Sequence, residues 1–162
     1  MKSLTLLRHA EAVAMADTID DSQRALTARG QAQASALGER LRADGWVAQR
    51  ILCSSALRAQ QTAQGLCSAA GWKTKLSLRP SLYNADPHSM LDLLRQDGGD
   101  VERLLLVAHA PGIAELASVL TTRRGDLSLV CEPATLIEVM MDIERWTDIV
   151  PGCASLRCIL PS

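Results

Sequence analysis

Short apolar runs alternate with helix-like segments along most of this chain, and this alternation limits the fold more than any other feature of the sequence. Strands are predicted over residues 4–7, 51–53, 75–79 and 104–108. Helices are predicted over residues 28–43, 56–70, 87–94 and 113–120. Such an alternation is typical of an α/β sheet whose parallel strands are joined by right-handed helical crossovers.

Residues that favour helix ends border several of these segments. Thr27 and Ser55 each precede a predicted helix and are candidate N-caps. Gly45 and Gly71 follow the first two helices, where glycine commonly ends a helix. Pro87 suits the first turn of the third helix. These residues support the positions assigned to the helices.

The end of the chain breaks the alternation. Residues 134–141 and 155–160 are predicted as two closing strands with no helix between them, which favours an antiparallel edge. At 162 residues the chain has the length of one domain. We therefore expect residues 1–162 to form a single-domain, three-layer α/β/α sandwich with a mostly parallel central sheet and an antiparallel edge.

Composition excludes several classes of partner. The 48% hydrophobic and 22% charged residues match a globular protein with a packed core. Lys plus Arg (17) nearly balances Asp plus Glu (18), so no overall field attracts DNA or an anionic membrane. Three Trp, one Tyr and no Phe leave little surface for stacking nucleic acid bases. We expect that the protein binds neither nucleic acid nor membranes, and that it is a monomer.

The cysteines and the first residues of the sequence indicate the cellular compartment in which the protein is expected. Five cysteines form an odd set without a C-x-x-C pair, and we interpret them as reduced, mostly buried thiols. The apolar stretch at the N-terminus reaches Arg8 after seven residues, which is too short for a signal peptide or a membrane span. A cytoplasmic location is predicted.

Candidate functional residues follow three of the predicted strands. Arg8 and His9 come directly after the first strand, Arg58 one helical turn after the second, and His109 directly after residues 104–108. Open α/β sheets bind ligands at the carboxyl ends of their strands, where these residues are expected to meet. Each alone has an ordinary interpretation, because a polar strand end or a surface arginine is common. Their combination favours a functional site.

The chemistry of these four side chains suits a dianionic phosphoryl group. A guanidinium holds two phosphoryl oxygens in a planar fork and stays charged at any working pH. The helix start after His109 adds free backbone N–H groups. A histidine that is largely neutral near pH 7 can attack phosphorus without a separate base. Acidic residues do not cluster with His9 and His109 in a ligand pattern, so we expect no metal and no cofactor.

Four segments are similar to the motifs of one family. Leu7-Arg8-His9-Ala10 resembles its Arg-His-Gly signature, and Arg24-Ala25-Leu26-Thr27-Ala28-Arg29-Gly30 resembles an Arg-x-Leu-Thr-x-x-Gly segment. Residues 54–63 are similar to its Ser-x-x-x-Arg-Ala-x-x-Thr helix start, and Ala108-His109-Ala110-Pro111 to its second histidine segment. The family is the histidine phosphatase superfamily, which includes phosphoglycerate mutases and acid phosphatases. The order and spacing agree from residue 4 to about residue 120.

The resemblance implies a fold, a reaction and roles. The fold would be phosphoglycerate mutase-like, and the short chain resembles the SixA-type phosphohistidine phosphatases, which have no long lid insertions. His9 would be the nucleophile, Arg8 and Arg58 would bind the phosphoryl oxygens, and a protonated His109 would stabilise the transferring group. Arg24 would be a further phosphate or substrate contact. The reaction would be metal-independent hydrolysis of a phosphoric monoester or phosphoramidate.

Two features depart from the family pattern or leave it incomplete. Ala10, Ala108 and Ala110 stand where relatives often carry Gly, Gly and Asn, and an added methyl could narrow the approach to phosphate. The candidates for a general acid are Asp86 and Glu11. Asp86 precedes Pro87 and is favoured as a helix N-cap. A phosphohistidine substrate, with its weakly basic imidazole leaving group, has less need of an acid.

Two alternatives to a protein phosphohistidine phosphatase stay open. A sister enzyme could hydrolyse a small phosphorylated metabolite such as a sugar phosphate. A pseudophosphatase could bind phosphoproteins without turning them over. A mutase is disfavoured, because it needs an enclosed site to rebind its intermediate. The partner is accordingly a phosphohistidine-containing protein or a small phosphorylated substrate.

Overall fold

A six-stranded sheet forms the centre of the protein in the computed structural model, which describes residues 1–16, 20–122 and 124–161. The strands are β1 (Lys2–Arg8), β2 (Arg50–Ser54), β3 (Leu76–Arg79), β4 (Arg103–Ala108), β5 (Leu136–Met141) and β6 (Ala154–Leu160). Their order across the sheet is β3-β2-β4-β1-β5-β6. Strands β1 to β4 pair in parallel, whereas β5 pairs antiparallel with both β1 and β6. The predicted antiparallel edge is confirmed.

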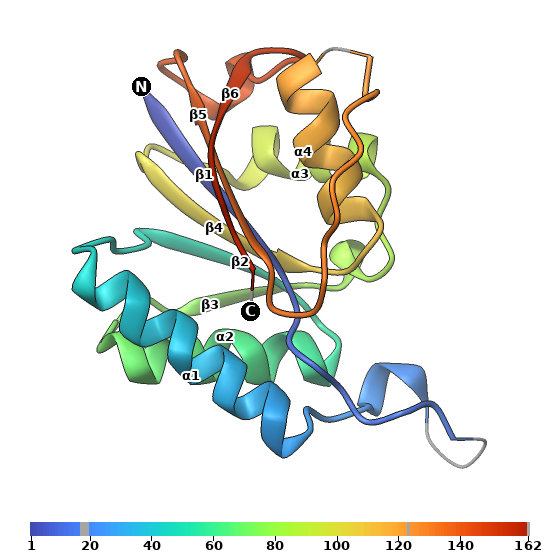
Figure 1. Cartoon of the computed structure of the whole chain (residues 1–162). Helices are drawn as coiled ribbons and strands as arrows, with labels where there is room; N and C mark the ends of the chain where they lie inside the picture. The colour runs from blue at the N-terminus through green and yellow to red at the C-terminus, as the bar shows by residue number, and fades with distance from the viewer. Residues whose placement is uncertain (17–19, 123, 162) are drawn as a thin grey trace.

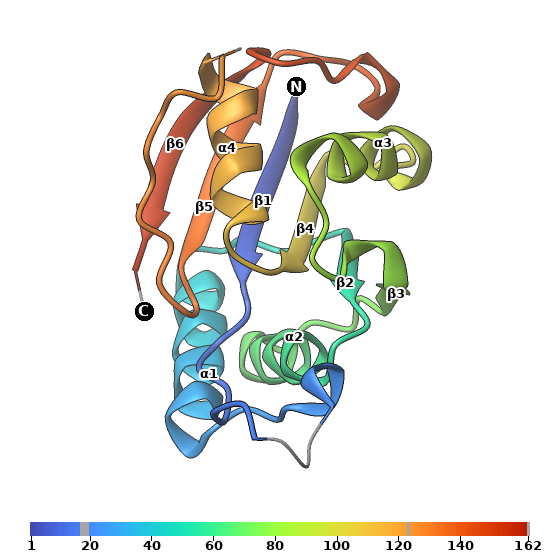
Figure 2. The same cartoon turned by 90° about the vertical axis from the view of Figure 1, so that its right-hand side faces the viewer.

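Helices cover both faces of this sheet. Helices α1 (Ala28–Ala43) and α2 (Leu57–Ala70) lie on one face, and α3 (Pro87–Asp97) and α4 (Gly112–Thr122) lie on the other (Figures 1 and 2). Short 3-10 helices lie in the connections: η1 (Asp21–Gln23), η2 (Pro80–Leu82) and η3 (Trp146–Asp148). The predicted three-layer α/β/α sandwich is confirmed.

Two apolar cores lie between these layers, and strand β1 contributes to both. Its fully buried Leu4 and Leu6 pack in the core beneath α3 and α4, whereas Leu7 packs in the core beneath α1 and α2. Successive side chains of a strand point to opposite faces, so a strand covered on both sides reads as a continuous apolar run. Each fully buried leucine stabilises the fold by about 2 kcal/mol.

The predicted helix-capping residues agree with the structure at all but one position, although α3 and α4 extend beyond their predicted ranges. The Thr27 hydroxyl accepts from the Gly30 N–H, and Gly71 ends α2 in the left-handed conformation. The prediction that Ser55 is the N-cap of α2 is wrong. The capping position belongs to Ala56, which offers no side-chain acceptor, and the Ser54 hydroxyl accepts the Ala56 N–H at 3.3 Å instead.

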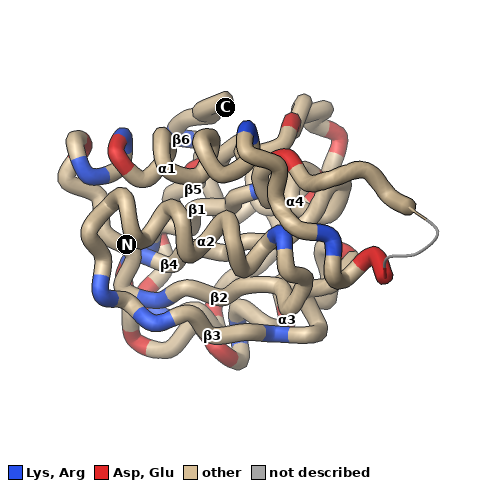
Figure 3. The backbone as a smooth tube through the Cα atoms, turned by 90° about the horizontal axis from the view of Figure 1, so that it is seen from below, with Lys and Arg blue, Asp and Glu red and all other residues tan. Residues whose placement is uncertain are grey.

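The structure also bears on the cysteines, on the distribution of charged residues and on the length of the helices. All five cysteines are free thiols, but Cys53 and Cys67 alone are fully buried and the other three are partly exposed. Basic and acidic positions are interspersed over the face seen in Figure 3. Within the described parts of the chain, no helix is long and apolar enough to cross a membrane.

Helices α1 and α2 approach closely at Gly38, which suggests a test of their packing. A Cβ at Gly38 would lie 2.3 Å from the Leu66 carbonyl oxygen, whereas one at Gly65 would meet only the Ala34 methyl at 3.2 Å. We expect Gly38→Ala to lower the free energy of unfolding by about 1–3 kcal/mol through overpacking. Gly65→Ala should lower the free energy of unfolding less, because the higher helix propensity of alanine offsets the close contact with the Ala34 methyl. Urea unfolding measures both, and equal losses would contradict this account.

Candidate active site

Strand pairing brings the two predicted histidines together. Arg8 at the end of β1 pairs with Ala108 at the end of β4, and the His9 N–H donates to the Ala108 carbonyl at 3.0 Å. His9 and His109 therefore leave neighbouring parallel strands at the same edge of the sheet. Their ring centroids are 5.2 Å apart. This is the edge at which open α/β sheets bind ligands.

Backbone contacts fix the orientation of His9. Its Nδ1 lies 2.8 Å from the Ala10 carbonyl oxygen, so Nδ1–H donates there and Nε2 keeps a free electron pair. Thr62 of α2 holds the next backbone N–H, because its hydroxyl oxygen accepts from Ala10 N at 2.9 Å and donates to the Arg58 carbonyl. The Nε2 atom of His9 accepts from Arg58 Nε at 3.3 Å. The sequence after β1 thus leaves an electron pair on Nε2, directed toward Arg58 Nε.

The hydrogen bonds of His109 assign the opposite tautomer. Its Nε2 lies 2.7 Å from the Ser54 hydroxyl, and its Nδ1 lies 3.4 Å from Arg58 Nη2. A guanidinium can only donate, so Nδ1 carries the electron pair and Nε2–H donates to Ser54. Protonation would convert Nδ1, which now accepts from Arg58 Nη2, into a hydrogen-bond donor. An anion bound there would favour that proton.

Burial controls the charge of both histidines. It is the largest factor that lowers the pKa of His9 from 6.5 to about 4, and Arg58 and Arg8 lower it further. Burial also lowers the pKa of His109 to about 3, followed by repulsion from His9 and Arg58. Both rings are therefore neutral near pH 7 in the absence of a bound anion.

Three arginines complete the site. Arg58 is almost fully buried at the start of α2, whereas Arg8 and Arg24 are partly exposed. Arg8 Nη1 donates to the Cys131 carbonyl at 2.6 Å, and its buried Nε has no hydrogen-bond partner among the described residues. Arg24 Nη1 donates to the Val13 carbonyl at 2.8 Å.

All five predicted site residues line one cavity of about 530 Å³, together with Glu11, Ala12, Asp21, Asn84, Ala110 and Pro133. An open cavity lined by three arginines and two histidines suits an anion with several acceptor oxygens.

Sequence reasoning missed three residues at this site. Asp21 forms ion pairs with Arg24 and Arg58, at 2.9 and 3.0 Å. The Tyr83 hydroxyl donates to Asp21, and its ring packs edge-on against His109. Ser54 orients His109 as described above. Asp21 and Tyr83 lie in connecting segments rather than at strand ends, so nothing in the apolar pattern singled them out. Ser54 ends β2 within a recognised motif and could have been found.

The three alanines that depart from the family pattern, Ala10, Ala108 and Ala110, differ in their surroundings. The methyl groups of Ala10 and Ala108 are fully buried in the two apolar cores, and neither residue lines the cavity. Ala110 does line it. Narrowing of the phosphate approach is therefore expected only at Ala110.

The two candidate acids both have structural partners. Asp86 caps α3, because its carboxylate accepts from the Ser89 N–H at 3.0 Å, and it does not line the cavity. Glu11 does line the cavity, but its carboxylate accepts from the Thr27 hydroxyl at 2.7 Å and pairs with Arg29. The N-cap interpretation of Asp86 is confirmed.

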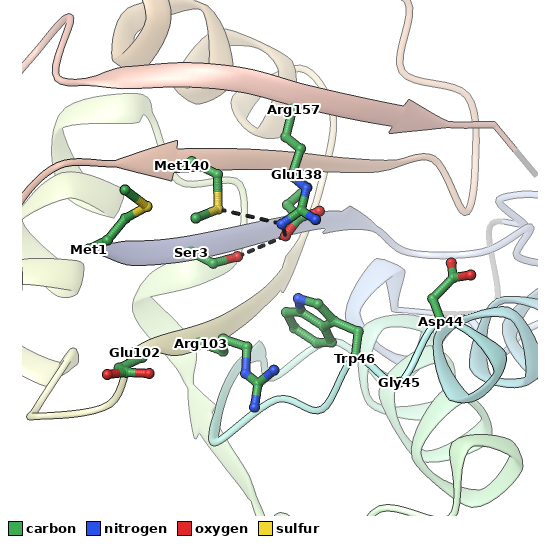
Figure 4. Close-up of a pocket in the computed structure, with 10 residues that line it drawn as sticks. All are labelled: Met1, Ser3, Asp44, Gly45, Trp46, Glu102, Arg103, Glu138, Met140 and Arg157. Carbon is green, nitrogen blue, oxygen red and sulfur yellow. Dashed lines mark hydrogen bonds and ion pairs between the residues drawn. The ribbon is translucent and has the colours of Figure 1, made fainter.

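A second hollow lies at the opposite edge of the sheet and contains none of the predicted site residues. It has a volume of about 390 Å³ and is bordered by Ser3, Trp46, Arg103, Glu138 and Arg157, among others (Figure 4). The Glu138 carboxylate accepts from Ser3 at 2.9 Å and lies 3.5 Å from Arg157, so its charge is compensated within the protein. The described residues contain no group of three or more His, Cys, Asp or Glu side chains arranged to hold a metal ion.

Comparison with known sequences identifies the family. A sequence model of the histidine phosphatase superfamily (branch 1) matches residues 4–97, which is more than half of the chain. The Mycobacterium tuberculosis protein Rv1276c, described as uncharacterized, is 34% identical over 156 residues, which cover 93% of this chain and 96% of that protein. The chain therefore belongs to the histidine phosphatase superfamily.

Solved structures narrow this class to the SixA type. A Nakamurella multipartitia protein assigned as a phosphohistidine phosphatase SixA has a TM-score of 0.83 and 25% identity, covering 99% of this chain and 95% of that one. The protein histidine phosphatase SixA bound to tungstate gives a TM-score of 0.83 at 21% identity, with coverage of 98% and 96%. The mycobacterial glucosyl-3-phosphoglycerate phosphatase gives a lower TM-score of 0.68 at 17% identity, with 96% coverage of both chains.

The lowered pKa values predict how stability depends on pH. Between pH 6.5 and pH 4 the unfolded chain binds protons at His9 and His109 that the folded protein does not. Stability is therefore complete above pH 6.5 and falls with decreasing pH, by up to about 1.4 kcal/mol per pH unit for each histidine.

Urea unfolding at a series of pH values checks this expectation. His9→Asn and His109→Asn should each flatten the dependence, whereas the exposed His88 provides a matched control in His88→Asn. A wild-type protein equally stable at pH 4.5 and pH 7 would show that the two rings are not held neutral by burial.

Proposed function

We propose that this protein is a phosphatase that hydrolyses phosphohistidine in a partner protein, by way of a phosphoryl group carried on His9. The observation that carries the proposal is the fixed tautomer of His9, whose Nε2 electron pair accepts from Arg58 Nε, in a cavity that Arg8, Arg24 and His109 also line. Membership of the histidine phosphatase superfamily and the likeness to SixA structures support the same reaction.

In the first step, the Nε2 electron pair of His9 attacks phosphorus while the bond between phosphorus and the substrate's ring nitrogen breaks. That nitrogen keeps the electron pair of the bond, and the ring leaves as neutral imidazole because its other nitrogen carries a proton. Arg58 Nε, which donates to His9 Nε2 at 3.3 Å, would exchange this acceptor for a phosphoryl oxygen. The bound dianion raises the pKa of His109, whose protonated Nδ1 then donates to another oxygen. Arg8 and Arg24 contribute further positive charge.

In the second step, a water oxygen attacks phosphorus and the bond to His9 Nε2 breaks. Inorganic phosphate leaves, the electron pair returns to Nε2, and the water proton passes to phosphate or solvent. Because His9 Nδ1 donates to the Ala10 carbonyl throughout, the ring returns in the tautomer needed for the next turnover.

The surroundings of the leaving group favour phosphohistidine as substrate. The described residues that line the cavity include two carboxylates, Glu11 and Asp21, and both are engaged in ion pairs. Hydrogen bonds from Tyr83, Arg24 and Arg58 lower the pKa of Asp21 to about 2, so it holds no proton to donate near pH 7. An alkoxide leaving group needs such a proton much more than an imidazole does.

Short connections beside the cavity also fit a protein substrate. Residues 80–86 join β3 to α3, and residues 109–111 join β4 to α4, so neither connection has the length of a lid. The longer connection from β1 to α1 also lines the cavity, but these two short connections would leave their side open to a histidine side chain of another folded protein. We further propose that the protein acts in the cytoplasm as a monomer, without a metal ion.

The proposed function predicts a preference between substrates. Purified protein in the presence of a chelator should dephosphorylate a phosphohistidine-bearing phosphocarrier protein and act poorly on a panel of sugar phosphates. Release of inorganic phosphate measures both activities. His9→Ala should lose at least about 10³-fold in turnover, because it removes the nucleophile. His88→Ala, which changes an exposed histidine, should retain wild-type activity.

Other outcomes would reassign the protein. Rapid turnover of a sugar phosphate with no preference for phosphoprotein would favour a metabolite phosphatase, the activity named for the structural neighbour glucosyl-3-phosphoglycerate phosphatase. Tight binding of the phosphoprotein without phosphate release would identify a pseudophosphatase. Activity that is abolished by the chelator would contradict a metal-independent reaction.

A further inference from the structure

Asp21 makes more contacts with the arginines of the site than any residue predicted from the sequence, and the reaction proposed above gives it no part. It is the first residue of η1, which lies beside α2 (Figure 2). Its Oδ2 accepts from Arg58 Nη2 at 3.0 Å, and its Oδ1 accepts from Arg24 Nε at 2.9 Å. Its backbone carbonyl accepts from Arg58 Nη1 at 2.6 Å.

These contacts divide the guanidinium of Arg58 into two edges. The Nη1/Nη2 edge is occupied by Asp21, through its backbone carbonyl and its carboxylate. The Nε/Nη2 edge faces the histidines, with Nε 3.3 Å from His9 Nε2 and Nη2 3.4 Å from His109 Nδ1. A planar guanidinium held along one edge cannot rotate its other edge away from its target.

Tyr83 binds the same carboxylate oxygen of Asp21 as Arg58 does. Its hydroxyl donates to Asp21 Oδ2, and its ring lies 5.9 Å below the Arg58 guanidinium. The ring also packs edge-on against His109, with centroids 5.5 Å apart. Tyr83 therefore links Asp21 to both the arginine and the second histidine of the site.

We propose that Asp21 is a positioning residue that holds Arg58 so that its Nε/Nη2 edge meets the phosphoryl group, with Tyr83 fixing the Asp21 carboxylate in turn. This inference rests on the proposed function, since it requires a phosphoryl group between His9 and His109. Asp21 acts through Arg58 and does not touch the reacting atoms.

The opposite role for Asp21 makes a different prediction. A carboxylate beside two arginines could compete with phosphate, and its removal would then tighten phosphate binding. The geometry favours positioning, because Asp21 occupies the edge of Arg58 that faces away from the histidines. Inorganic phosphate binding therefore distinguishes the two roles.

Asp21→Asn tests the proposal, with Asp20→Asn as its matched control. Asp20 is the exposed neighbouring carboxylate, and it accepts from the Ser22 N–H. We expect Asp21→Asn to lower kcat/KM by about 10²-fold, mainly through kcat, because a small misplacement of a catalytic donor has this effect. It should also weaken binding of inorganic phosphate in calorimetry. Asp20→Asn should match the wild type in both measurements.

A spectroscopic measurement tests the contact without any substrate. Tyr83 is the single tyrosine of the chain, so the ultraviolet absorbance of phenolate reports on it alone. Its hydrogen bond to Asp21 raises the pKa of Tyr83. Asp21→Asn should shift this titration to lower pH, whereas Asp20→Asn should leave it unchanged. Tyr83→Phe keeps the ring and should lower kcat/KM less than Asp21→Asn does.

Each remaining outcome overturns the inference. Tighter phosphate binding or faster turnover in Asp21→Asn would make Asp21 a competitor of the substrate. Equal behaviour of the Asp21 and Asp20 variants would show that the contacts have no role at the site. If the wild type hydrolyses no phosphohistidine, the proposed function fails, but phosphate binding still decides whether Asp21 positions Arg58, and the tyrosine titration still tests the contact between Tyr83 and Asp21.

Discussion

The parallel pairing of β1 with β4 is the interaction on which the site depends. Its register places Arg8 opposite Ala108, so the residues that follow, His9 and His109, emerge side by side. A slip by one residue would turn the side chains of β1 to the opposite face and bury polar groups in an apolar core. The packing that stabilises the sheet therefore also sets the separation of the two histidine rings, whose centroids are 5.2 Å apart.

Helix α2 supplies the charge that this pair of neutral rings lacks. Arg58 lies in its first turn and donates toward both histidines, and Thr62 one turn later holds the backbone beside His9. Removing a guanidinium from water is costly unless it is paired, and Asp21 provides the compensating charge. The site is thus preorganised for an anion, with its donors held by the fold before the substrate arrives.

Sequence reasoning predicted the fold, which the structure confirms, and five residues that the structure brings together around one cavity, because the strands and most of these positions follow from local patterns. Apolar runs define strands, and Arg8, His9 and His109 come directly after two of them. The N-cap of α2 was misassigned to Ser55 because capping depends on where the chain turns, and the turn places Ala56 at the N-cap, with its N–H donating to the Ser54 hydroxyl. Asp21 and Tyr83 were missed because 62 residues separate them, and their contact exists only in the folded protein.

The central claim is that a phosphoryl group is carried on His9, and direct detection of that intermediate tests it. Protein mixed with a phosphohistidine-bearing phosphocarrier, quenched in alkali within milliseconds and analysed by peptide mass spectrometry, should carry one phosphoryl group on His9. The group should disappear as phosphate is released, and Arg58→Ala should form it more slowly. A phosphoryl group found on His109, or turnover without any phosphorylated enzyme, would contradict the account.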